Sequence, residues 1–308
     1  MERFTEDYVL KNLPLIVRDA ARPDGGWPCV EKWSSRYLKE HVGHANIRVR
    51  AKPQQDGMFG DVGRLGEGCI HLYDFEEVNF GDFLESLDAS SPAYYGARLQ
   101  VQEDLPELVP DMPNFYELPW REAFGVPYKG GIIAYFGSGK QSTPLHYDPL
   151  ENLIFMVQGS KTFLLFHPSD SANLYPSTTN VGTHYSLVPS HRLLSDQTDA
   201  EGFELVQNAR CLRVTLRQGD MLYLPICWWH AVQGCEGSNV SLHYWFAQSR
   251  LKEDYDVYKS YLEVKFAHWV EQLETMDLPG GVMSEGRKEA KEMIEAKLKE
   301  RQDFSWGS

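Results

Sequence analysis

The sequence has few cysteines, and no two of them form a close pair. Its five cysteines are an odd number scattered along 308 residues, without a C-x-x-C motif. This pattern excludes a cysteine-based zinc finger and a dithiol redox motif. Single thiols are typical of a reducing compartment, so we expect a protein of the cytoplasm, the nucleus or both.

Long apolar runs are also missing. Charged residues crowd the N-terminus (MERFTED), where a signal peptide would need an apolar stretch. No apolar segment is long enough to span a bilayer. We therefore expect neither a signal peptide nor a membrane partner.

Basic residues are in deficit. Lys and Arg number 30 against 44 Asp and Glu, which gives a formal net charge of −14. Such a field repels nucleic acid, so no nucleic-acid partner is expected, and it attracts a basic protein or peptide. An acidic surface also keeps a protein in solution without steering any partner, and this simpler explanation is preferred.

Apolar residues make up 42% of the chain, enough for one large core. The residue pattern predicts an N-terminal α/β extension (1–129), a β-rich core (130–248) and a C-terminal helical segment (249–308). In the last segment, apolar residues recur at helical spacing (255–270), and a charged helix follows. The first of these helices is expected to pack on the core or, alternatively, to form a homodimer interface.

Turn residues and apolar runs locate the regular elements. In the extension, the predicted helices are 33–42 and 80–87, and the predicted strands are 13–18 and 70–73. Proline and aromatic residues predict an ordered loop at 106–128. In the core, short strands separated by glycine turns indicate a sandwich or barrel. The predicted core strands are 132–137, 153–157, 162–166, 210–216, 221–224 and 240–247.

A candidate metal site begins with His146 and Asp148. The segment that contains them resembles a strand, in which side chains two residues apart point to the same face. Two histidines with one carboxylate are the ligand set of non-haem Fe(II) oxygenases, and they leave coordination positions open. Alone, however, an H-x-D triplet is more often a surface histidine near a carboxylate.

Downstream residues strengthen this interpretation. Asn152 has the same strand parity as His146, and Lys161 opens an apolar strand directly after a glycine turn. A buried ammonium is costly without a partner, and the distal carboxylate of 2-oxoglutarate would provide one. By itself, a lysine that reaches solvent at the strand end is the better explanation.

A third ligand must come from a distant strand, and His230 is the candidate. It follows an apolar strand, a proline and two tryptophans, Trp228 and Trp229, which would exclude water. A core histidine bonded to the backbone is the ordinary alternative. In the last strand, one face is apolar and the other carries groups that would line a cavity. The residues of that second face are Ser241, His243 and Trp245.

Three stretches together resemble the JmjC oxygenases of the cupin superfamily, especially the small protein hydroxylases without reader domains. They are TPLHYDPLENLIFMVQGSKTFLLFHPSD (143–170), LRQGDMLYLPICWWHAV (216–232) and SLHYWF (241–246). The resemblance covers residues 130–247 and is weaker upstream. It implies a mainly β fold with a double-stranded β-helix core of the jelly-roll or cupin type. An N-terminal α/β extension and C-terminal helices would flank this core.

The resemblance also implies roles for individual residues. His146, Asp148 and His230 would ligate Fe(II), with 2-oxoglutarate as cosubstrate and O2 as oxidant. Around 2-oxoglutarate it implies Lys161 and Thr143 at the distal carboxylate, together with Asn152, Tyr135 and His243. His243 stands where asparaginyl and lysyl hydroxylases of the family have asparagine. Gln100 and Gln102 fall where related hydroxylases place residues between cosubstrate and substrate.

The activity implied by the resemblance is that of a 2-oxoglutarate-dependent dioxygenase. It would hydroxylate a C–H bond on a protein side chain, namely lysine, asparagine, histidine or arginine. Demethylation of N-methyl-lysine uses the same iron chemistry and is the first alternative, and a small-molecule substrate is another. Two hypotheses belong to other functional classes. One is a metal-binding cupin that needs no cosubstrate, and the other is a non-catalytic scaffold. Lys161 argues against the cosubstrate-free enzyme, because such an enzyme needs no cation there.

Overall fold

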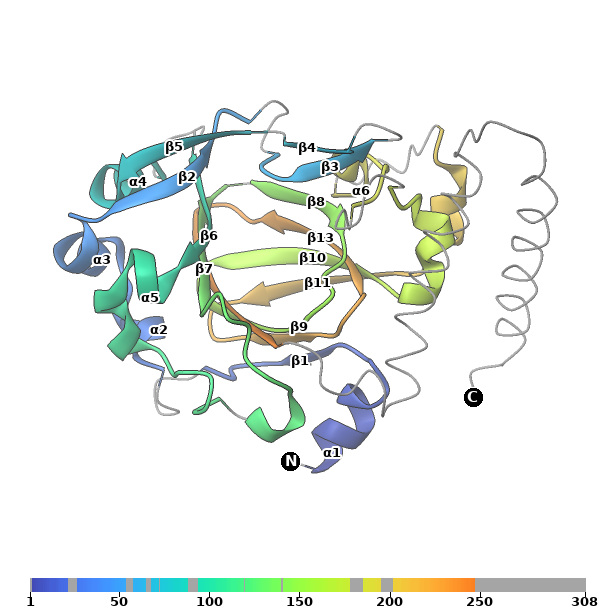
Figure 1. The fold of residues 1–308 in the computed structure, drawn as a ribbon, viewed down its shortest axis with the longest axis horizontal. Helices are drawn as coiled ribbons and strands as arrows, with labels where there is room; N and C mark the ends of the chain where they lie inside the picture. Colours follow the sequence, from blue (N-terminus) through green and yellow to red (C-terminus); the bar gives the residue numbers. More distant parts are fainter. Residues whose placement is uncertain are drawn as a thin grey trace, which may run out of the picture.

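Two antiparallel sheets face each other and form the core of the molecule (Figure 1). The computed structural model describes residues 2–21, 27–53, 58–64, 68–71, 73–87, 94–118, 120–139, 141–177, 185–194 and 202–246. The predicted C-terminal helices, their packing and the homodimer interface lie outside these residues. Within the described ranges, no helix has both the length and the hydropathy needed to cross a membrane.

The larger sheet holds eight of the described strands. In spatial order they are β1 (Leu15–Val17), β12 (Met221–Leu224), β9 (Glu151–Gln158), β14 (Ser238–Phe246), β7 (Ile133–Ser138), β6 (Tyr94–Gln100), β2 (Asn46–Ala51) and β5 (Asp74–Asn79). The smaller sheet comprises β11 (Cys211–Arg217), β10 (Ser160–Phe166), β13 (Trp229–Gly234) and β8 (Ser142–His146). A separate hairpin pairs β3 (Asp61–Arg64) with β4 (Gly68–His71). The prediction of a mainly β fold with a double-stranded β-helix core is confirmed.

Short helices cover the outer faces of both sheets. Figure 1 shows α2 to α5 gathered on one side of the molecule, beyond β6 and β7. The helices before residue 130 are α1 (Glu2–Phe4), η1 (Thr5–Val9), α2 (Pro28–Lys32), α3 (Ser35–Val42), α4 (Phe80–Leu87), α5 (Val101–Asp104), η3 (Pro106–Asp111) and η4 (Arg121–Ala123). Those after it are η5 (Pro168–Leu174), α6 (Ser190–Leu194) and η6 (Glu204–Asn208).

Strand β9 contributes to two cores at once. Leu153, Phe155 and Val157 join the apolar cluster that the N-terminal helices cover. Ile154 and Met156 belong to a second cluster, which lies between the two sheets. Successive side chains of a strand point to opposite faces, so a strand buried on both faces must be apolar throughout. This explains the uninterrupted apolar run in the sequence.

Strand β14 has one apolar and one polar face, as its sequence predicts. The residues of its apolar face, all in the outer cluster, are Val240, Leu242, Tyr244 and Phe246. On the opposite face, His243 and Trp245 line a cavity, and Ser241 accepts a hydrogen bond from Lys161. The polar face therefore belongs to the interior between the sheets.

Most of the predicted elements form. Helix α4 has the predicted bounds, and Ser34 caps α3 by accepting a hydrogen bond from the Tyr37 amide at 3.3 Å. The predicted strand 70–73 is displaced, because β4 ends at His71. The sequence did not predict β2, β5, β6 or β13. Since β6, β2 and β5 extend the larger sheet beyond β7, the sheet crosses the predicted boundary at residues 129 and 130. The boundaries of the three segments stay predictions.

A buried carboxylate ties three of the outer helices together. Asp111, at the end of η3, accepts hydrogen bonds from Lys32 Nζ at 2.7 Å, Trp33 Nε1 at 3.2 Å and Tyr37 OH at 2.6 Å. Burial by itself would raise the pKa of Asp111, but these donors hold the pKa below its ordinary value. The ionised form therefore stabilises the fold, and this contribution is lost as the pH falls through the lowered pKa.

Replacing Asp111 by asparagine is expected to lower the free energy of unfolding at pH 7 by about 2–3 kcal/mol, because a charged acceptor of three hydrogen bonds is lost. Urea unfolding followed by circular dichroism measures this. The control is Glu40→Gln, which breaks an exposed i,i+4 pair with Arg36 and should change nothing measurable. Equal effects of the two substitutions would contradict the role given to Asp111.

Candidate metal centre and cavity

Strand pairing brings two distant histidines together. In the antiparallel pair of β8 and β13, His146 lies directly opposite His230. The register shifts between His230 and Val232, so a bulge follows the second histidine. Asp148 lies two residues beyond the end of β8, and its carbonyl accepts a hydrogen bond from the Cys227 amide at 3.0 Å. The strand therefore positions His146, and the loop after it positions Asp148.

The three side chains converge on one point. Their candidate ligand atoms all lie within 4.8 Å of one another, and His230 Nε2 is 3.8 Å from Asp148 Oδ2. His146 Nδ1 lies 2.8 Å from the Pro144 carbonyl, and His230 Nδ1 lies 3.0 Å from the Trp228 carbonyl. A carbonyl only accepts, so each Nδ1 carries the hydrogen and each Nε2 presents a lone pair. This is the tautomer that a metal requires.

Electrostatics also favour metal binding. Burial, assisted by the neighbouring His146, lowers the pKa of His230 to about 4. The imidazole is therefore neutral at physiological pH and needs no deprotonation to bind a metal. Two imidazole nitrogens and one carboxylate oxygen suit a mid-series divalent cation such as Fe(II). His146, Asp148 and His230 could thus hold the ion that the sequence predicts.

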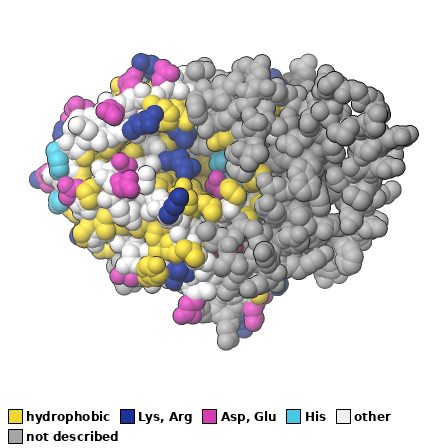
Figure 2. All heavy atoms as spheres, viewed as in Figure 1, with side chains coloured by type: hydrophobic (Ala, Val, Ile, Leu, Met, Phe, Trp, Pro, Cys, Tyr) yellow, Lys and Arg dark blue, Asp and Glu magenta, His cyan; other side chains and the backbone are white. Residues whose placement is uncertain are grey.

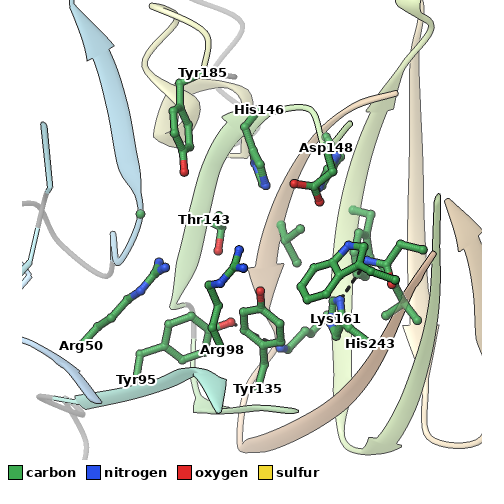
Figure 3. A pocket seen from close by; sticks show the side chains of 17 residues that line it. Arg50, Tyr95, Arg98, Tyr135, Thr143, His146, Asp148, Lys161, Tyr185 and His243 are labelled. Atoms are coloured by element: carbon green, nitrogen blue, oxygen red, sulfur yellow. Dashed lines mark hydrogen bonds and ion pairs between the residues drawn. The ribbon is translucent and has the colours of Figure 1, made fainter. Parts of the chain in front are cut away.

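A cavity of about 680 Å³, open to solvent, lies in front of these ligands (Figure 3). Both sheets contribute to its wall. Besides the three candidate ligands, the wall contains Arg50, Gly60, Tyr95, Arg98, Tyr135, Thr143, Asn152, Ile154, Lys161, Phe163, Tyr185, Val232, His243 and Trp245. All five residues predicted around 2-oxoglutarate are in this set, whereas Gln100 and Gln102 are not. Gln102 instead accepts a hydrogen bond from the Ile132 amide.

Lys161 is a buried cation without a carboxylate. Its side chain, only 3% exposed, follows the tight turn in which Gly159 adopts a φ of 68°. The ammonium donates to Ser241 Oγ at 3.1 Å and to the Tyr95 hydroxyl at 3.5 Å. No carboxylate of the described residues pairs with it, and burial lowers its pKa to about 7. The position suits an anionic ligand, which would restore the charged form.

Tyr95 completes the surroundings of this lysine and was not predicted from the sequence. Thr143 donates a hydrogen bond to its phenolic oxygen, so the two hydroxyls and the ammonium lie close together. Tyr135, which was predicted, presents its ring 5.3 Å from Lys161 Nζ. A tyrosine in an apolar strand is usually a core residue, and no local signal separated Tyr95 from that case.

Both ring nitrogens of His243 have partners within the protein. Asn152 Nδ2 donates to His243 Nδ1 at 3.1 Å, and His243 Nε2 lies 3.1 Å from Ser241 Oγ. Burial, and then the nearby charge of Lys161, lower the pKa of His243 well below its ordinary value. The ring is therefore neutral and donates from Nε2 to Ser241. His243 joins Asn152 to the serine that holds Lys161.

One polar atom of Asn152 is not satisfied by the described residues. Its Oδ1 is buried and has no hydrogen-bond partner among the described residues. Such an acceptor is costly unless it meets a donor, and a water molecule held near a metal would supply one. A carboxylate oxygen would not, so Asn152 suits a water molecule better than 2-oxoglutarate itself.

The two tryptophans before His230 lie on opposite sides of the smaller sheet. Trp228 packs between the sheets and donates to the Asn12 carbonyl, whereas Trp229 packs on the outer face and donates to Ser171. Neither lines the cavity, so the prediction that both would form its dry wall is wrong. Trp245 is the tryptophan of that wall. Adjacent residues of a strand alternate between its faces, which explains the separation.

Comparisons with known proteins agree with this geometry. A family model described as a cupin-like domain matches residues 1–252. Over 281 residues, 85% of this chain and 84% of the relative, the chain is 31% identical to the Homo sapiens protein named "Bifunctional peptidase and (3S)-lysyl hydroxylase JMJD7". The chain belongs to the JmjC family of cupin-like proteins. Within it, JmjC relatives differ in their named activities.

Two further JmjC relatives illustrate this range. "Jumonji C domain-containing protein 5" of Drosophila melanogaster is 29% identical over 223 residues, 71% of this chain and 52% of its own length. "Lysine-specific demethylase 8" of Xenopus tropicalis is 24% identical over 249 residues, 80% of this chain and 51% of its own length. The chain thus spans about half the length of these two. The names include both hydroxylase and demethylase, so family membership alone does not select one activity.

Proposed function

We propose that this protein is an Fe(II)- and 2-oxoglutarate-dependent dioxygenase that hydroxylates a C–H bond of a protein side chain. One observation carries the proposal, namely the His146, Asp148 and His230 triad in the same cavity as a buried lysine without a carboxylate. A metal site alone would suit many cupins. The second, cationic site is what an enzyme needs when its cosubstrate is a dicarboxylate.

The proposed metal and cosubstrate sites lie at two ends of the cavity. At one end, His146, Asp148 and His230 hold the metal through Nε2, a carboxylate oxygen and Nε2. At the other, Lys161, with the hydroxyls of Thr143 and Tyr95, binds the distal carboxylate of 2-oxoglutarate. The rings of Tyr135 and Trp245 add apolar surface to the cavity wall. The protein thus orients the cosubstrate by both of its ends.

The bound Fe(II) and 2-oxoglutarate together supply the oxidising chemistry, which the protein side chains lack. In the balanced reaction, 2-oxoglutarate, O2 and a C–H bond give succinate, CO2 and a C–OH group. Neutral His230 has no proton to lose on metal binding. Asn152 Oδ1, buried and unpaired among the described residues, can accept a hydrogen bond from a water molecule near the metal.

Relatives support a protein substrate, since the names of two of them specify lysine as the residue acted on. Among protein reactions, the cavity favours hydroxylation over N-methyl-lysine demethylation. The wall contains Arg50 and Arg98, and its only carboxylate among the described residues is the candidate ligand Asp148. A methylated ammonium ion would find no counter-charge there.

Anaerobic titration tests the proposal directly. Fe(II) and 2-oxoglutarate added together, but neither alone, should produce the visible charge-transfer band of a chelated Fe(II)–2-oxoglutarate complex. On admission of O2, succinate should form, and mass spectrometry of side chains in candidate peptides should show the addition of one oxygen atom. A protein that binds the metal but gives neither the band nor succinate would be a metal-binding cupin of another kind.

A further inference from the structure

The mouth of the cavity carries two arginines that the proposed reaction does not yet use. Arg50 comes from β2 and Arg98 from β6. Figure 3 shows both guanidinium groups directed into the space beside Thr143 and below His146 and Asp148. In Figure 2, Lys and Arg side chains gather on the described part of this face, next to a hollow in which a histidine is visible. Two arginines therefore border the described part of the entrance, although the whole chain is acidic.

Arg98 reaches this place through an irregular backbone. Tyr95 and Arg98 both line the cavity, yet residues three apart face opposite sides of a regular strand. The register of β6 against β7 shifts between Gly96 and Leu99, and Arg98 adopts a φ of 64°. A left-handed conformation is unfavourable for arginine, and such conformations cluster where a bulge turns a side chain toward a site.

Neither guanidinium has a carboxylate partner among the described residues. Arg98 lies over the ring of Trp245, 5.3 Å from its centroid. Arg50 lies 4.5 Å from the ring centroid of Tyr73 and donates one hydrogen bond to the Phe59 carbonyl. A ring contact uses none of the five N–H donors of a guanidinium, so donors stay available on both groups. Each guanidinium thus lies against an aromatic ring and has no carboxylate partner among the described residues.

Trp245 adds a further donor to the same wall. Its Nε1–H is buried and has no acceptor among the described residues. With Arg50, Arg98 and Lys161, this gives a cavity rich in donors whose only described carboxylate is Asp148. Fe(II) and the dianion of 2-oxoglutarate cancel each other in charge. Counted over the described residues of its wall, the loaded site therefore keeps a net positive charge.

We propose that Arg98 and Arg50 bind a carboxylate of the substrate, so that the side chain presented for hydroxylation is aspartate or glutamate. The inference rests on the proposed function and specifies its substrate class. A guanidinium binds a carboxylate through two parallel hydrogen bonds, which would fix the direction of the side chain relative to the metal. Lysine or arginine in the same place would meet two like charges and no counter-charge.

The net charge of −14 does not oppose this assignment. Charges farther away than about 8 Å are largely screened at physiological ionic strength. The binding free energy at the mouth is set by the nearby guanidinium groups, whereas the distant acidic surface mainly slows the approach of an acidic peptide. The global charge would attract a basic target, whereas the arginines at the cavity oppose one.

The test compares peptides that differ only at one central residue, which is aspartate, glutamate, asparagine, glutamine, lysine or arginine. Hydroxylation, followed by mass spectrometry, should favour aspartate or glutamate over the isosteric amides. A single aspartate residue with capped termini is tested alongside the peptides. Its hydroxylation would show that one residue suffices, and its failure to react that a longer peptide is needed. Preference for lysine or arginine would overturn the inference.

Variants then locate the carboxylate. Arg98→Gln should raise the KM for the acidic peptide about 10- to 100-fold, the range expected for charge-assisted hydrogen bonds. Arg98→Lys keeps the charge but loses the planar guanidinium, so its KM should lie between those of the wild type and Arg98→Gln. The matched control is Arg48→Gln, because Arg48 lies on the same strand as Arg50, contacts the ring of Phe75 and does not line the cavity. Arg50→Gln should resemble Arg98→Gln rather than this control.

The anaerobic affinity for 2-oxoglutarate separates the two proposals. If Arg98→Gln leaves this affinity unchanged while the KM rises, the arginine serves the substrate. If it weakens 2-oxoglutarate as strongly as the loss of Lys161 does, Arg98 serves the cosubstrate and the inference fails while the proposed function stands. If the wild-type protein forms no complex with Fe(II) and 2-oxoglutarate, the proposed function itself fails.

Discussion

Replacing His230 by alanine is expected to weaken the affinity for Fe(II) well beyond the roughly 10- to 100-fold that the loss of an outer-shell partner costs. His230 supplies one of the three ligand atoms, and its orientation is set by the hydrogen bond to the Trp228 carbonyl. With two ligands left, the charge-transfer band and succinate formation should both disappear. Isothermal titration with Mn(II), which O2 does not oxidise readily, measures metal affinity independently of activity.

The control for this experiment is His44→Ala, because the His44 side chain is 71% exposed and lies outside the cavity. It should bind metal as the wild type does. Circular dichroism guards against misfolding, since His230 is buried. A His230→Ala protein that folds and binds Mn(II) with wild-type affinity would disprove the metal centre.

Replacing Lys161 by methionine is expected to change stability and cosubstrate binding in opposite directions. Methionine removes a buried charge that has no carboxylate partner, so the free energy of unfolding at pH 6 should rise by about 2–4 kcal/mol. The same change removes the cation opposite 2-oxoglutarate and should weaken its binding roughly 10- to 100-fold. Urea unfolding and anaerobic titration of the charge-transfer band measure the two effects.

The pKa of Lys161, lowered to about 7, gives both effects a pH dependence. The unfolded lysine has the higher pKa, so its burial destabilises the protein fully below pH 7. This penalty is relieved as the pH rises from 7 toward the ordinary lysine value. The stabilising effect of Lys161→Met should therefore shrink above pH 7.

The affinity for 2-oxoglutarate should depend on pH through the same group, Lys161. Above pH 7 the free protein must take up a proton on Lys161 when the dicarboxylate binds, so affinity should fall by up to about tenfold per pH unit. Lys161→Met should abolish this slope. The control Lys11→Met, at a side chain that is 52% exposed, should leave both the slope and the affinity unchanged. A steep slope that survives in Lys161→Met would assign the titration to another group.

Local patterns in the sequence carried a large part of the fold. An uninterrupted apolar run identified the central part of β9 as a strand, and alternation divided β14 between an apolar and a polar face. Helix α4 has its predicted bounds, whereas the helix predicted at 33–42 begins at Ser35. These features depend on neighbours within a few residues, where strand and helix periods act directly. The missed strand β5 is exposed or half-buried along its length, which leaves little periodicity to identify, whereas β2 alternates regularly and was overlooked.

Local sequence patterns predicted fewer features of the site than of the fold. The H-x-D pair and the buried lysine could be singled out, because a charged group at the start of an apolar strand requires a partner. Their roles around 2-oxoglutarate came from the resemblance, and Tyr95, Arg50 and Arg98 were missed. In the sequence, Arg98 looks like the outward residue of an alternating strand, and only the bulge in β6 turns it inward.

The sequence by itself determined which residues could be ligands, which face of the last strand is apolar, and that Lys161 opens an apolar strand. Only the tertiary structure decided that His230 lies opposite His146, that Asp148 meets them from a loop, and that two arginines border the cavity. The physical reason is that side-chain parity is a local property of the backbone. Strand register and bulges, in contrast, depend on pairing between segments far apart in the chain.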